Sequence, residues 1–404
     1  MISVTRRELL LAAGLFPTLG ATAPVKEVLL PDRSSFPVEG VYLDAAFTHP
    51  FGRAALDAAS SYLKLRQSDP QGVGPAHNAR SAAVERFARL INAGPVDIAV
   101  VPSTMIAENL VNASLGIGAG AGVVTDALHY DASLALYAEL QRRGASLGVV
   151  LPREGRIDLA DVRALLARDT RLVAVSLVSN STGFEHDLAE LCALAHGVGA
   201  LVYADIIQAA GAVPIDVKAS GVDFAACGTY KWMMGDFGAA FLYVRPDRLE
   251  QLKRVEVGWR QLRRSESHVF PFEPPGPAVG SYELASSAAG IFEVSTPAWG
   301  ALAVAAGSLD YIAAIGLDAI VSHRQPLIDQ LQLKLPQLGF DSLTPKGSRS
   351  AVAGFAYRGA EKRFAQRLRE AKIRIGVYEN RIRISPSVYN TLDDIDHLIS
   401  VLSS

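Results

Sequence analysis

The feature that most constrains this chain is an apolar run that ends in a single carboxylate. The run reads ALVYA over residues 200–204 and is followed directly by Asp205. A short apolar run of this kind is typical of a buried strand, and in open α/β sheets ligands bind beyond the carboxyl ends of the strands. Lys231 follows in a tight polar segment, Gly228-Thr229-Tyr230-Lys231-Trp232. The pattern predicts an α/β fold with an acid and a lysine at one edge of its sheet.

Strands and helices alternate on both sides of this run, which predicts a parallel sheet between helices. Strands are expected over residues 98–101, 122–125, 146–151, 171–177, 200–204 and 237–244, and helices over 51–66, 77–92, 105–116, 132–143, 158–168 and 187–199. Helices over 298–314 and 317–335 lead to strands at 351–355, 372–376 and 381–385 and helices at 360–371 and 392–402. We therefore expect a large domain over residues 36–297 and a small α+β domain over 298–404.

The composition restricts the classes of function that are expected for this chain. The 404 residues are 50% hydrophobic and carry a formal net charge of −2, so the chain is globular and has no basic excess that would favour nucleic acid. Its two cysteines, Cys192 and Cys227, can form neither a structural zinc site nor a disulfide framework. Beyond the N-terminus, no apolar run reaches the length of a membrane span. We expect an enzyme that acts on a small molecule.

An acid that keeps a pyridine nitrogen protonated and a lysine that forms a Schiff base are the groups that pyridoxal phosphate chemistry requires. Three ordered motifs carry this pattern further: DIIQ at 205–208, VDF at 222–224 and YKWMMG at 230–235. With them the chain, from about Val41 to its C-terminus, resembles the class V aminotransferases. That family belongs to the fold-type I pyridoxal-phosphate enzymes and includes cysteine desulfurases, kynureninases and isopenicillin epimerase-like proteins. The resemblance implies a mostly parallel, seven-stranded sheet between helices and a smaller α+β C-terminal domain.

The resemblance also assigns roles around the cofactor, pyridoxal 5′-phosphate. Lys231 is expected to form the Schiff base, Asp205 to contact the pyridine nitrogen, and Gln208 to donate to the phenolic oxygen. A contact with a protonated ring should hold the pKa of Asp205 below its reference of about 3.9. Burial beside a cationic ring should lower the pKa of Lys231, so that the neutral amine can attack an aldehyde. Asp223 is expected to support the lysine loop.

A strand followed by a hydroxyl-rich turn and a helix start, over residues 98–105, has the form of a phosphate cradle, because free N–H groups and the positive helix end face an anion. The resemblance places the phosphate at Ser103 and Thr104, with the register open by one residue up to Met105. Thr229 and Tyr230 are expected to reach the phosphate as well. Thr296, in Ser295-Thr296-Pro297, is expected to reach it across a dimer interface, which implies a homodimer with shared active sites.

Two further positions complete the expected cofactor site. Tyr130, with His129 as the alternative, is expected to stack on the cofactor ring, since a flat π-system is favourable over a cationic pyridinium. Asn180 is expected to hydrogen-bond near the phenolic oxygen or the substrate carboxylate.

The substrate is expected to be held from the two ends of the chain. Arg383 is expected to grip the α-carboxylate bidentately, and Arg381 and Arg374 are the competing candidates. Near the N-terminus, Thr48 or His49 is expected to reach the active site.

Two segments stand apart from this pattern. Residues 1–23 contain paired arginines, Arg6 and Arg7, an apolar stretch and an Ala-Thr-Ala sequence, which together predict a twin-arginine signal peptide and an exported protein. The alternative is an N-terminal helix that packs on a dimer partner in a cytoplasmic protein. Residues 253–285 are expected to be irregular and to serve as a lid, a dimer arm or a specificity loop.

The chemistry is narrowed by one departure from the family. Cysteine desulfurases carry a nucleophilic cysteine shortly before the carboxylate-binding arginine, whereas residues 374–380 are RIGVYEN. This argues against persulfide chemistry and leaves proton movement at the α-carbon of a small amino acid, with aminotransferase as the nominal subclass and β-lyase or epimerase as alternatives. A non-catalytic relative is the second hypothesis. A nicotinamide-binding protein is disfavoured, because no Gly-x-Gly-x-x-Gly turn follows the first strand.

Overall fold

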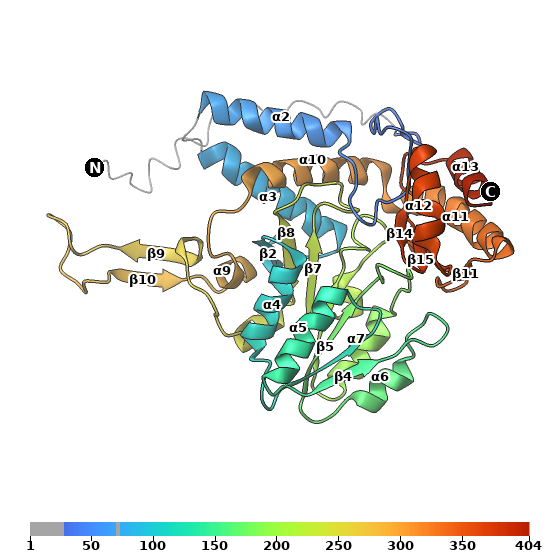
Figure 1. Ribbon diagram of the computed structural model, residues 1–404. Helices are drawn as coiled ribbons and strands as arrows, with labels where there is room; N and C mark the ends of the chain where they lie inside the picture. Colours follow the sequence, from blue (N-terminus) through green and yellow to red (C-terminus); the bar gives the residue numbers. More distant parts are fainter. Residues whose placement is uncertain (1–27, 70–72, 404) are drawn as a thin grey trace.

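The computed structural model describes residues 28–69 and 73–403, and its centre is a seven-stranded sheet (Figure 1). The strand order is β2-β8-β7-β6-β5-β3-β4, and β8 alone runs antiparallel to its neighbours. The strands are β2 (Ile98–Val101), β3 (Gly122–Asp126), β4 (Leu147–Val150), β5 (Thr170–Ser176), β6 (Leu201–Asp205), β7 (Phe224–Gly228) and β8 (Ala240–Val244). This confirms the predicted fold-type I architecture with its mostly parallel sheet.

Helices cover both faces of the sheet, because alternate residues of each strand enter two separate apolar cores. One core joins Val173, Val175 and Val202 to α3 (Val73–Leu90), α6 (Leu159–Leu165), α7 (Leu188–His196) and α10 (Trp299–Ile315). The other joins Leu172, Ala174 and Tyr203 to α4 (Thr104–Leu115), α5 (Asp131–Arg142) and α9 (Ala288–Phe292). Such burial on both faces explains why the strands appear in the sequence as continuous apolar runs.

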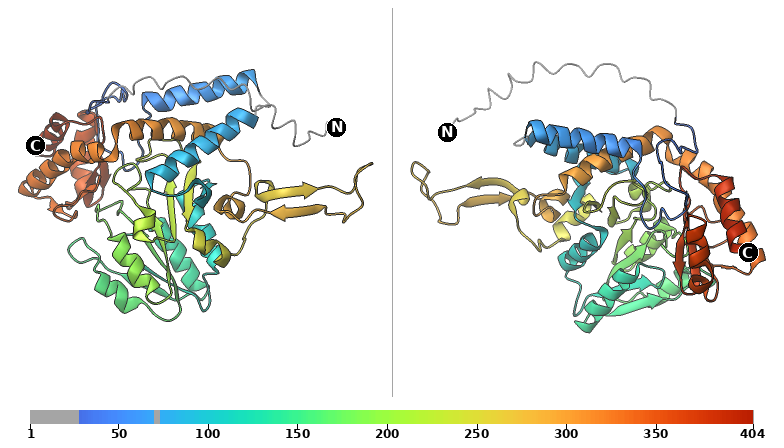
Figure 2. Two further views of the ribbon diagram at one scale, coloured as in Figure 1. Left: turned by 180° about the vertical axis from the view of Figure 1, so that it is seen from behind. Right: turned by 45° about the horizontal axis from the view of Figure 1, so that its top comes forward.

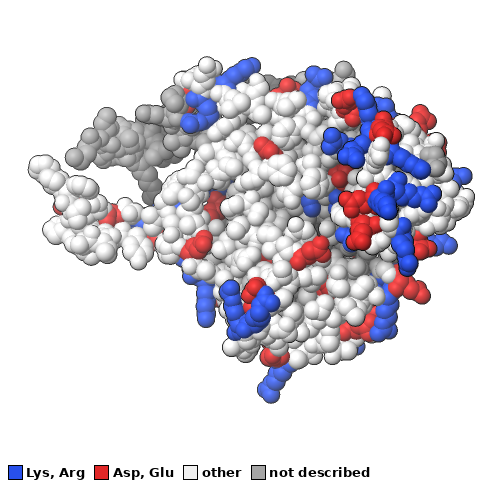
Figure 3. Space-filling model, viewed as in Figure 1, with Lys and Arg blue, Asp and Glu red and all other residues white. Residues whose placement is uncertain are grey.

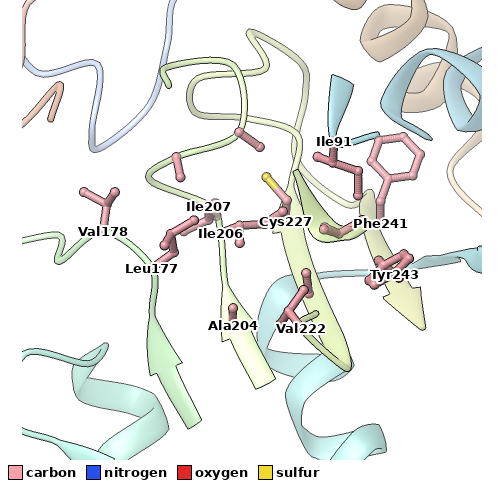
Figure 4. Packing of buried hydrophobic residues seen from close by; sticks show 14 of the residues in the cluster. Ile91, Leu177, Val178, Ala204, Ile206, Ile207, Val222, Cys227, Phe241 and Tyr243 are labelled. Carbon is pink, nitrogen blue, oxygen red and sulfur yellow. The ribbon is translucent and has the colours of Figure 1, made fainter. Parts of the chain in front are cut away.

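The apolar packing continues past the carboxyl ends of the strands. Figure 4 shows Leu177 and Val178 after β5, Ile206 and Ile207 after β6, and Cys227 at the end of β7, all in one buried cluster. Residues directly after these strands are therefore fixed in position by packing in the core and are not exposed to solvent.

A smaller unit follows at the C-terminus. Its antiparallel sheet has the order β11-β12-β15-β14. Its elements are α11 (Leu317–Lys334), β11 (Asp341–Ser342), β12 (Ala353–Ala356), α12 (Ala360–Glu370), β13 (Ile373–Arg374), β14 (Gly376–Tyr378), β15 (Arg381–Ile384) and α13 (Leu392–Ser403).

The packing units do not follow the expected boundary at residue 297. Helix α10 buries Leu302, Ala306 and Leu309 in the core of the large sheet and packs on α2 (Arg53–Ser68) and α3. Conversely, β1 (Val41–Tyr42) pairs in parallel with β13, and Leu43 is buried in the small core. The chain therefore crosses between the two units near both ends, and residues from the N-terminal segment lie beside the C-terminal strands.

The expected irregular segment contains an antiparallel hairpin, formed by β9 (Leu262–Glu266) and β10 (Ser281–Leu284), which extends from the body (Figures 1 and 2). Its strands are polar, and Arg263 of one forms an ion pair with Glu283 of the other. The apolar alternation by which a strand is recognised is absent from this sequence, so the hairpin escaped prediction.

Within the described part of the chain, no single helix has the length and apolar character needed to cross a membrane. The consecutive helices at 299–315 and 317–338 reach these values only as a pair, and the pair is bent by 78°.

Candidate active site

A cavity opens at the carboxyl ends of β5, β6 and β7, beside the first turn of α4. It is lined by Ser103, Thr104, Met105, Tyr130, Ser176, Asn180, Asp205, Ile207, Gln208, Tyr230 and Lys231. Eight of these eleven residues were expected at the site from the sequence: Ser103, Thr104, Tyr130, Asn180, Asp205, Gln208, Tyr230 and Lys231. The parallel sheet explains the convergence, since the ends of neighbouring strands meet at one edge.

Asp205 is the last residue of β6 and is buried. Its Oδ1 accepts a hydrogen bond of 2.9 Å from the backbone N–H of Ile207. Burial raises the pKa of this carboxyl to about 6, against the lowering effects of that N–H and of the nearby His129. The expected pKa below 3.9 is therefore wrong for the chain alone, because it assumed a cationic partner that the side chain meets only when a ring is bound.

Lys231 is also buried, and its Nζ makes no hydrogen bond within the described residues; its nearest ring is that of Tyr230, with 5.8 Å from Nζ to the centroid. Burial lowers the pKa of the amine to about 8, partly offset by the attraction of Asp205. A neutral amine is thus accessible near neutral pH, which is what attack on a carbonyl requires.

The turn before α4 has the geometry of an anion site. Ser103 caps the helix, with its Oγ accepting from the N–H of Ile106 at 3.2 Å, and Thr104 Oγ1 accepts from the N–H of Gly228 at 2.9 Å. The second bond ties the start of α4 to the end of β7, so the helix N-terminus faces the cavity. Free N–H groups at such an end favour a phosphate.

Thr229 does not belong to this cradle. Its side chain is buried and donates to the backbone carbonyls of Asp236 and Ala239, away from the cavity. The expected phosphate contact is therefore wrong for Thr229. Tyr230, in contrast, lines the cavity, and its ring stacks on Phe237 with 4.6 Å between centroids.

Gln208 lines the cavity with an amide that is already oriented by the protein. Its Nε2 donates to the carbonyl of Ala46 at 3.0 Å, and its Oε1 accepts from the indole N–H of Trp232 at 2.8 Å. One N–H of the amide remains for a ligand.

The structure distinguishes Tyr130 from His129 as the candidate for stacking on the cofactor ring. Tyr130 lines the cavity and is 38% exposed. His129 is buried behind the wall, between Ser176 and Glu108. Tyr130 is therefore the ring available to a bound cofactor.

Arg383, on β15, lies next to Asn180 of the cavity wall. Its Nη1 donates to the backbone carbonyl of Asn180 at 3.2 Å, and its Nη2 donates to Asp44 at 2.9 Å. Its buried Nε has no partner within residues 28–69 and 73–403. Asp44 also lines a larger hollow of about 960 Å³ beside α12. The ion pair thus lies where this hollow approaches the cavity.

The competing arginines point elsewhere. Arg381 lies over the ring of Tyr378, 4.3 Å from its centroid, and Arg374 is exposed and lines the larger hollow.

Two expected contacts are not made within this chain. His49 is buried, but its Nε2 contacts Ser387 Oγ at 2.8 Å and its ring packs on Phe36 and Tyr389, so it does not line the cavity. Thr296 is exposed and not part of the cavity wall.

Asp223 lies at the opposite end of β7 from Lys231. It accepts from the N–H of Val202 at 2.7 Å and from Arg248 at 2.7 Å. It therefore ties the beginnings of β6 and β7 together and does not support the lysine loop.

The residues that the sequence did not reveal are Asp44, Ser176 and Glu108. Asp44 lies shortly before Thr48 and His49, the two residues near the N-terminus that were expected to reach the active site. Ser176 ends β5 as Asp205 ends β6, and the two are register partners. That shared position at a strand end was the signal that could have found Ser176.

Comparison with known proteins adds an independent line of evidence. The profile of the family described as "Aminotransferase class-V" matches residues 41–398. An uncharacterised aminotransferase of Bacillus subtilis, YcbU, is 28% identical over 363 residues, which cover 89% of this chain and 92% of that protein. A probable cysteine desulfurase of Pseudomonas aeruginosa is 29% identical over 400 residues, covering 92% and 95%.

Solved structures agree with the fold. The cysteine desulfurase CsdA of Escherichia coli superposes with a TM-score of 0.80 at 23% identity, over 93% of this chain and 98% of that one. A mutant of C-DES, solved with glycine covalently linked to its PLP cofactor, superposes with a TM-score of 0.79 at 20% identity, over 93% and 99%.

Proposed function

The chain belongs to the class V aminotransferases, and on that premise we propose that it acts at the α-carbon of a small amino acid, nominally as an aminotransferase. Its cofactor is pyridoxal 5′-phosphate. The observation that carries the proposal is a buried lysine amine without a hydrogen-bond partner among the described residues, in one cavity with a carboxylate that ends the neighbouring strand.

The residues at the cavity fit this cofactor. The helix start at Ser103 and Thr104 offers N–H groups to a phosphate, Asp205 offers a carboxylate to the pyridine nitrogen, and Lys231 offers an amine to the aldehyde. Tyr130 and Gln208 complete the walls around the ring. When bound, the cofactor supplies an electron sink for charge at the α-carbon.

The chain's own residues divide the remaining work. Lys231 Nζ, with a pKa of about 8, can carry a proton to and from the α-carbon at physiological pH. Arg383 can present its guanidinium to the substrate carboxylate, because it contacts Asn180 of the cavity wall and lies close enough to Lys231 to lower the pKa of that amine.

The relatives named cysteine desulfurases raise an alternative that the cysteines of this chain disfavour. Both thiols are buried, and burial raises the pKa of Cys192 to about 12 and that of Cys227 well above its ordinary value. The thiolate is the nucleophile in sulfur chemistry, and the chain has no other cysteine. We therefore propose transamination first, and β-elimination or epimerisation as the alternatives within the same site.

The experiment begins with the bound cofactor. Purified protein incubated with pyridoxal phosphate should show a visible absorbance band that hydroxylamine removes and that Lys231→Ala never forms, while Lys218→Ala, an exposed lysine, leaves it unchanged. Lys231→Ala should also lower turnover at least about 1,000-fold. A wild-type protein without the band would overturn the proposal.

A panel of amino acids then separates the reactions. Consumption that depends on a keto-acid acceptor supports transamination, release of pyruvate with ammonia or sulfide supports β-elimination, and exchange of the α-proton in heavy water without other turnover supports epimerisation. Turnover in none of these assays, by protein that carries the cofactor, would favour a non-catalytic relative.

We also propose a homodimer with shared sites. Charged residues crowd over the C-terminal unit, whereas the centre of the same face is almost free of them (Figure 3). Leu56 and Leu63 of α2, Ile106 of α4, and Phe270 and Phe272 of the projecting hairpin are exposed apolar side chains that a partner would cover.

Sedimentation tests the dimer, and subunit mixing tests the sharing. If Thr296 reaches the partner's phosphate, mixing the Lys231→Ala and Thr296→Ala chains should restore activity, because half of the sites in each mixed dimer are then intact. A monomer, or a mixture without recovery, would contradict the shared site.

Export remains a proposal that rests on residues 1–23, which lie outside the described residues. Replacing Arg6 and Arg7 by lysine should keep the protein in the cytoplasm if the twin-arginine route is used. Cell fractionation of the wild type and the double variant distinguishes export from the cytoplasmic alternative.

A further inference from the structure

A buried carboxylate–imidazole pair lies directly behind the wall of the cofactor cavity. His129 Nε2 lies 3.1 Å from Glu108 Oε1, and both side chains have no exposed surface. The other ring nitrogen, Nδ1, lies 2.8 Å from Ser176 Oγ, and Ser176 lines the cavity. One hydrogen-bonded chain therefore runs from Glu108 through His129 to the cavity.

Glu108 is surrounded by donors. Its Oε1 accepts from Tyr137 at 2.6 Å as well as from His129, and its Oε2 accepts from Ser133 at 2.6 Å. An ionised carboxylate accepts several bonds, whereas a protonated one needs an acceptor for its own proton. Burial alone would raise the pKa of Glu108, but the attraction and hydrogen bond of His129, together with the hydrogen bonds of Ser133 and Tyr137, outweigh burial and the pKa is lowered.

His129 complements this carboxylate as a cation. Burial alone would lower the pKa of the imidazole. The attraction and hydrogen bond of Glu108, with smaller attractions from Asp205 and Asp126, outweigh burial, and the pKa is raised above 6.5. With both ring nitrogens protonated, Nδ1 must donate to Ser176 Oγ. The hydroxyl hydrogen of Ser176 is then free to face the cavity.

The cation is placed where Asp205 feels it. Ser176 and Asp205 are register partners at the ends of β5 and β6, and both line the cavity. The attraction of His129 lowers the pKa of Asp205 against the larger, raising effect of burial. Glu108 has a smaller effect in the opposite direction and raises the pKa of Asp205, whereas Lys231 lowers it. Asp205 also interacts with Cys227, Tyr137, Tyr203 and Tyr230.

Stability gives no reason to keep such a pair. Desolvation of two buried charges offsets much of their attraction, and apolar residues of similar volume are often as stable. A pair that is fully satisfied and lies next to the cofactor carboxylate is better explained by its effect on that carboxylate.

We propose that Glu108 and His129 are positioning residues for the cofactor: Glu108 holds His129 as a cation, and this cation keeps Asp205 ionised and turns the Ser176 hydroxyl toward the cavity. The inference rests on the proposed function, because it concerns the carboxylate that meets the pyridine nitrogen. Glu108→Gln keeps the shape of the side chain and removes the charge that holds the cation, so it tests the pair directly.

The first measurement is the affinity of the protein for pyridoxal phosphate as a function of pH, followed by the visible band. In Glu108→Gln the dissociation constant at neutral pH should rise at least about tenfold, and the pH below which affinity falls should move upward, because Asp205 takes up a proton more readily. His196→Gln is the control. It breaks a pair with Asp223, with 2.8 Å between Nε2 and Oδ2, at the opposite end of the sheet. It should leave the dissociation constant and its pH dependence unchanged. A Glu108→Gln protein with the wild-type constant and pH profile overturns the inference.

The second measurement detects the hydrogen bonds of His129 directly and does not depend on a bound cofactor. Proton NMR should show strongly downfield imidazole N–H signals in the wild type that are absent from both Glu108→Gln and His129→Gln. If these variants do not fold, Ser176→Ala retains the pair and its signals, and it should weaken cofactor binding several-fold. Wild-type affinity in Ser176→Ala, or no downfield signals in the wild type, contradicts the proposed hydrogen-bonded chain from Glu108 through His129 to Ser176. A wild type that shows the signals but binds no cofactor overturns the proposed function and leaves the charge pair standing.

Discussion

The two sides of the candidate site are built in different ways. On the cofactor side, Ser176 and Asp205 end adjacent parallel strands, and Lys231 follows the end of the next strand, all within one stretch of the chain. On the side proposed for the substrate, Asp44 and Arg383 meet from opposite ends of the sequence. The cofactor side is fixed by the register of one sheet, whereas the substrate side depends on how two packing units meet.

The difference has a chemical consequence. Nζ of Lys231 is without a hydrogen-bond partner among the described residues, so the cofactor side is prepared for a ligand. The guanidinium of Arg383 is already paired with Asp44 and with the carbonyl of Asn180. Substitutions should therefore separate the two sides.

Arg383→Leu should show the largest difference between substrate turnover and cofactor binding. It removes two charge-assisted bonds to the substrate carboxylate, each of which contributes about 1.5–3 kcal/mol, so kcat/KM should fall roughly 100- to 10,000-fold. The cofactor band should persist, because Arg383 is not among the cavity residues. Arg381→Leu, at the arginine stacked on Tyr378, is the control and should change kcat/KM less than about threefold. Loss of the band in Arg383→Leu would mean that the two sides are one unit.

The pH dependence of stability tests the cofactor side alone. The pKa of Asp205 is raised from 3.8 to about 6 in the folded chain without cofactor. Between these values the folded protein holds a proton that the unfolded chain has released, so the free energy of unfolding should fall as pH rises from about 4 to 6, by up to about 3 kcal/mol. Urea unfolding at a series of pH values measures the fall, and Asp205→Asn should remove it. An equal fall in Asp205→Asn would assign the proton to another group.

The same division explains what the sequence could predict. The large sheet follows from apolar runs that end in polar residues, and the ends of neighbouring parallel strands share one edge. Asp205 and Lys231 are recognisable for that reason. Most of the cavity wall was expected from the resemblance to the family. The pKa of Asp205 was misjudged because the prediction counted the charge of a bound ring, whereas burial has the larger effect in the chain alone.

The substrate side was less predictable. The role of Asp44 depends on the parallel pairing of β1 with β13, which brings the N-terminal segment beside β15. No local pattern reports such a pairing of two-residue strands. The same segment misled the assignment of His49, whose ring turns toward Phe36 and Tyr389 instead of the cavity.

Asp44→Asn sharpens the comparison from the substrate side. Asparagine keeps an oxygen for Arg383 but removes a negative charge that opposes a substrate carboxylate. The dissociation constant for a carboxylate ligand should therefore fall roughly 3- to 10-fold, which corresponds to about 1 kcal/mol. Glu39→Gln, which breaks an exposed ion pair with Lys372 on the rim of the same hollow, is the control and should leave the constant unchanged. Weaker binding in Asp44→Asn would instead mean that Asp44 orients Arg383 for the substrate.

The smallest effect distinguishes two threonines of the cofactor side itself. Thr104 lines the cavity and accepts from the N–H of Gly228, whereas Thr229 donates only to backbone carbonyls outside the cavity. Each change to valine removes one hydrogen-bonding hydroxyl, so each should lower the free energy of unfolding by about 1 kcal/mol. Only Thr104→Val should also weaken phosphate binding, by roughly 3- to 10-fold, because it loosens the turn that presents the N–H groups of α4. Titration with inorganic phosphate and with pyridoxal phosphate measures both variants. If Thr229→Val weakens phosphate binding equally, Thr229 also contributes to the phosphate site, and the lysine loop as a whole contacts the anion.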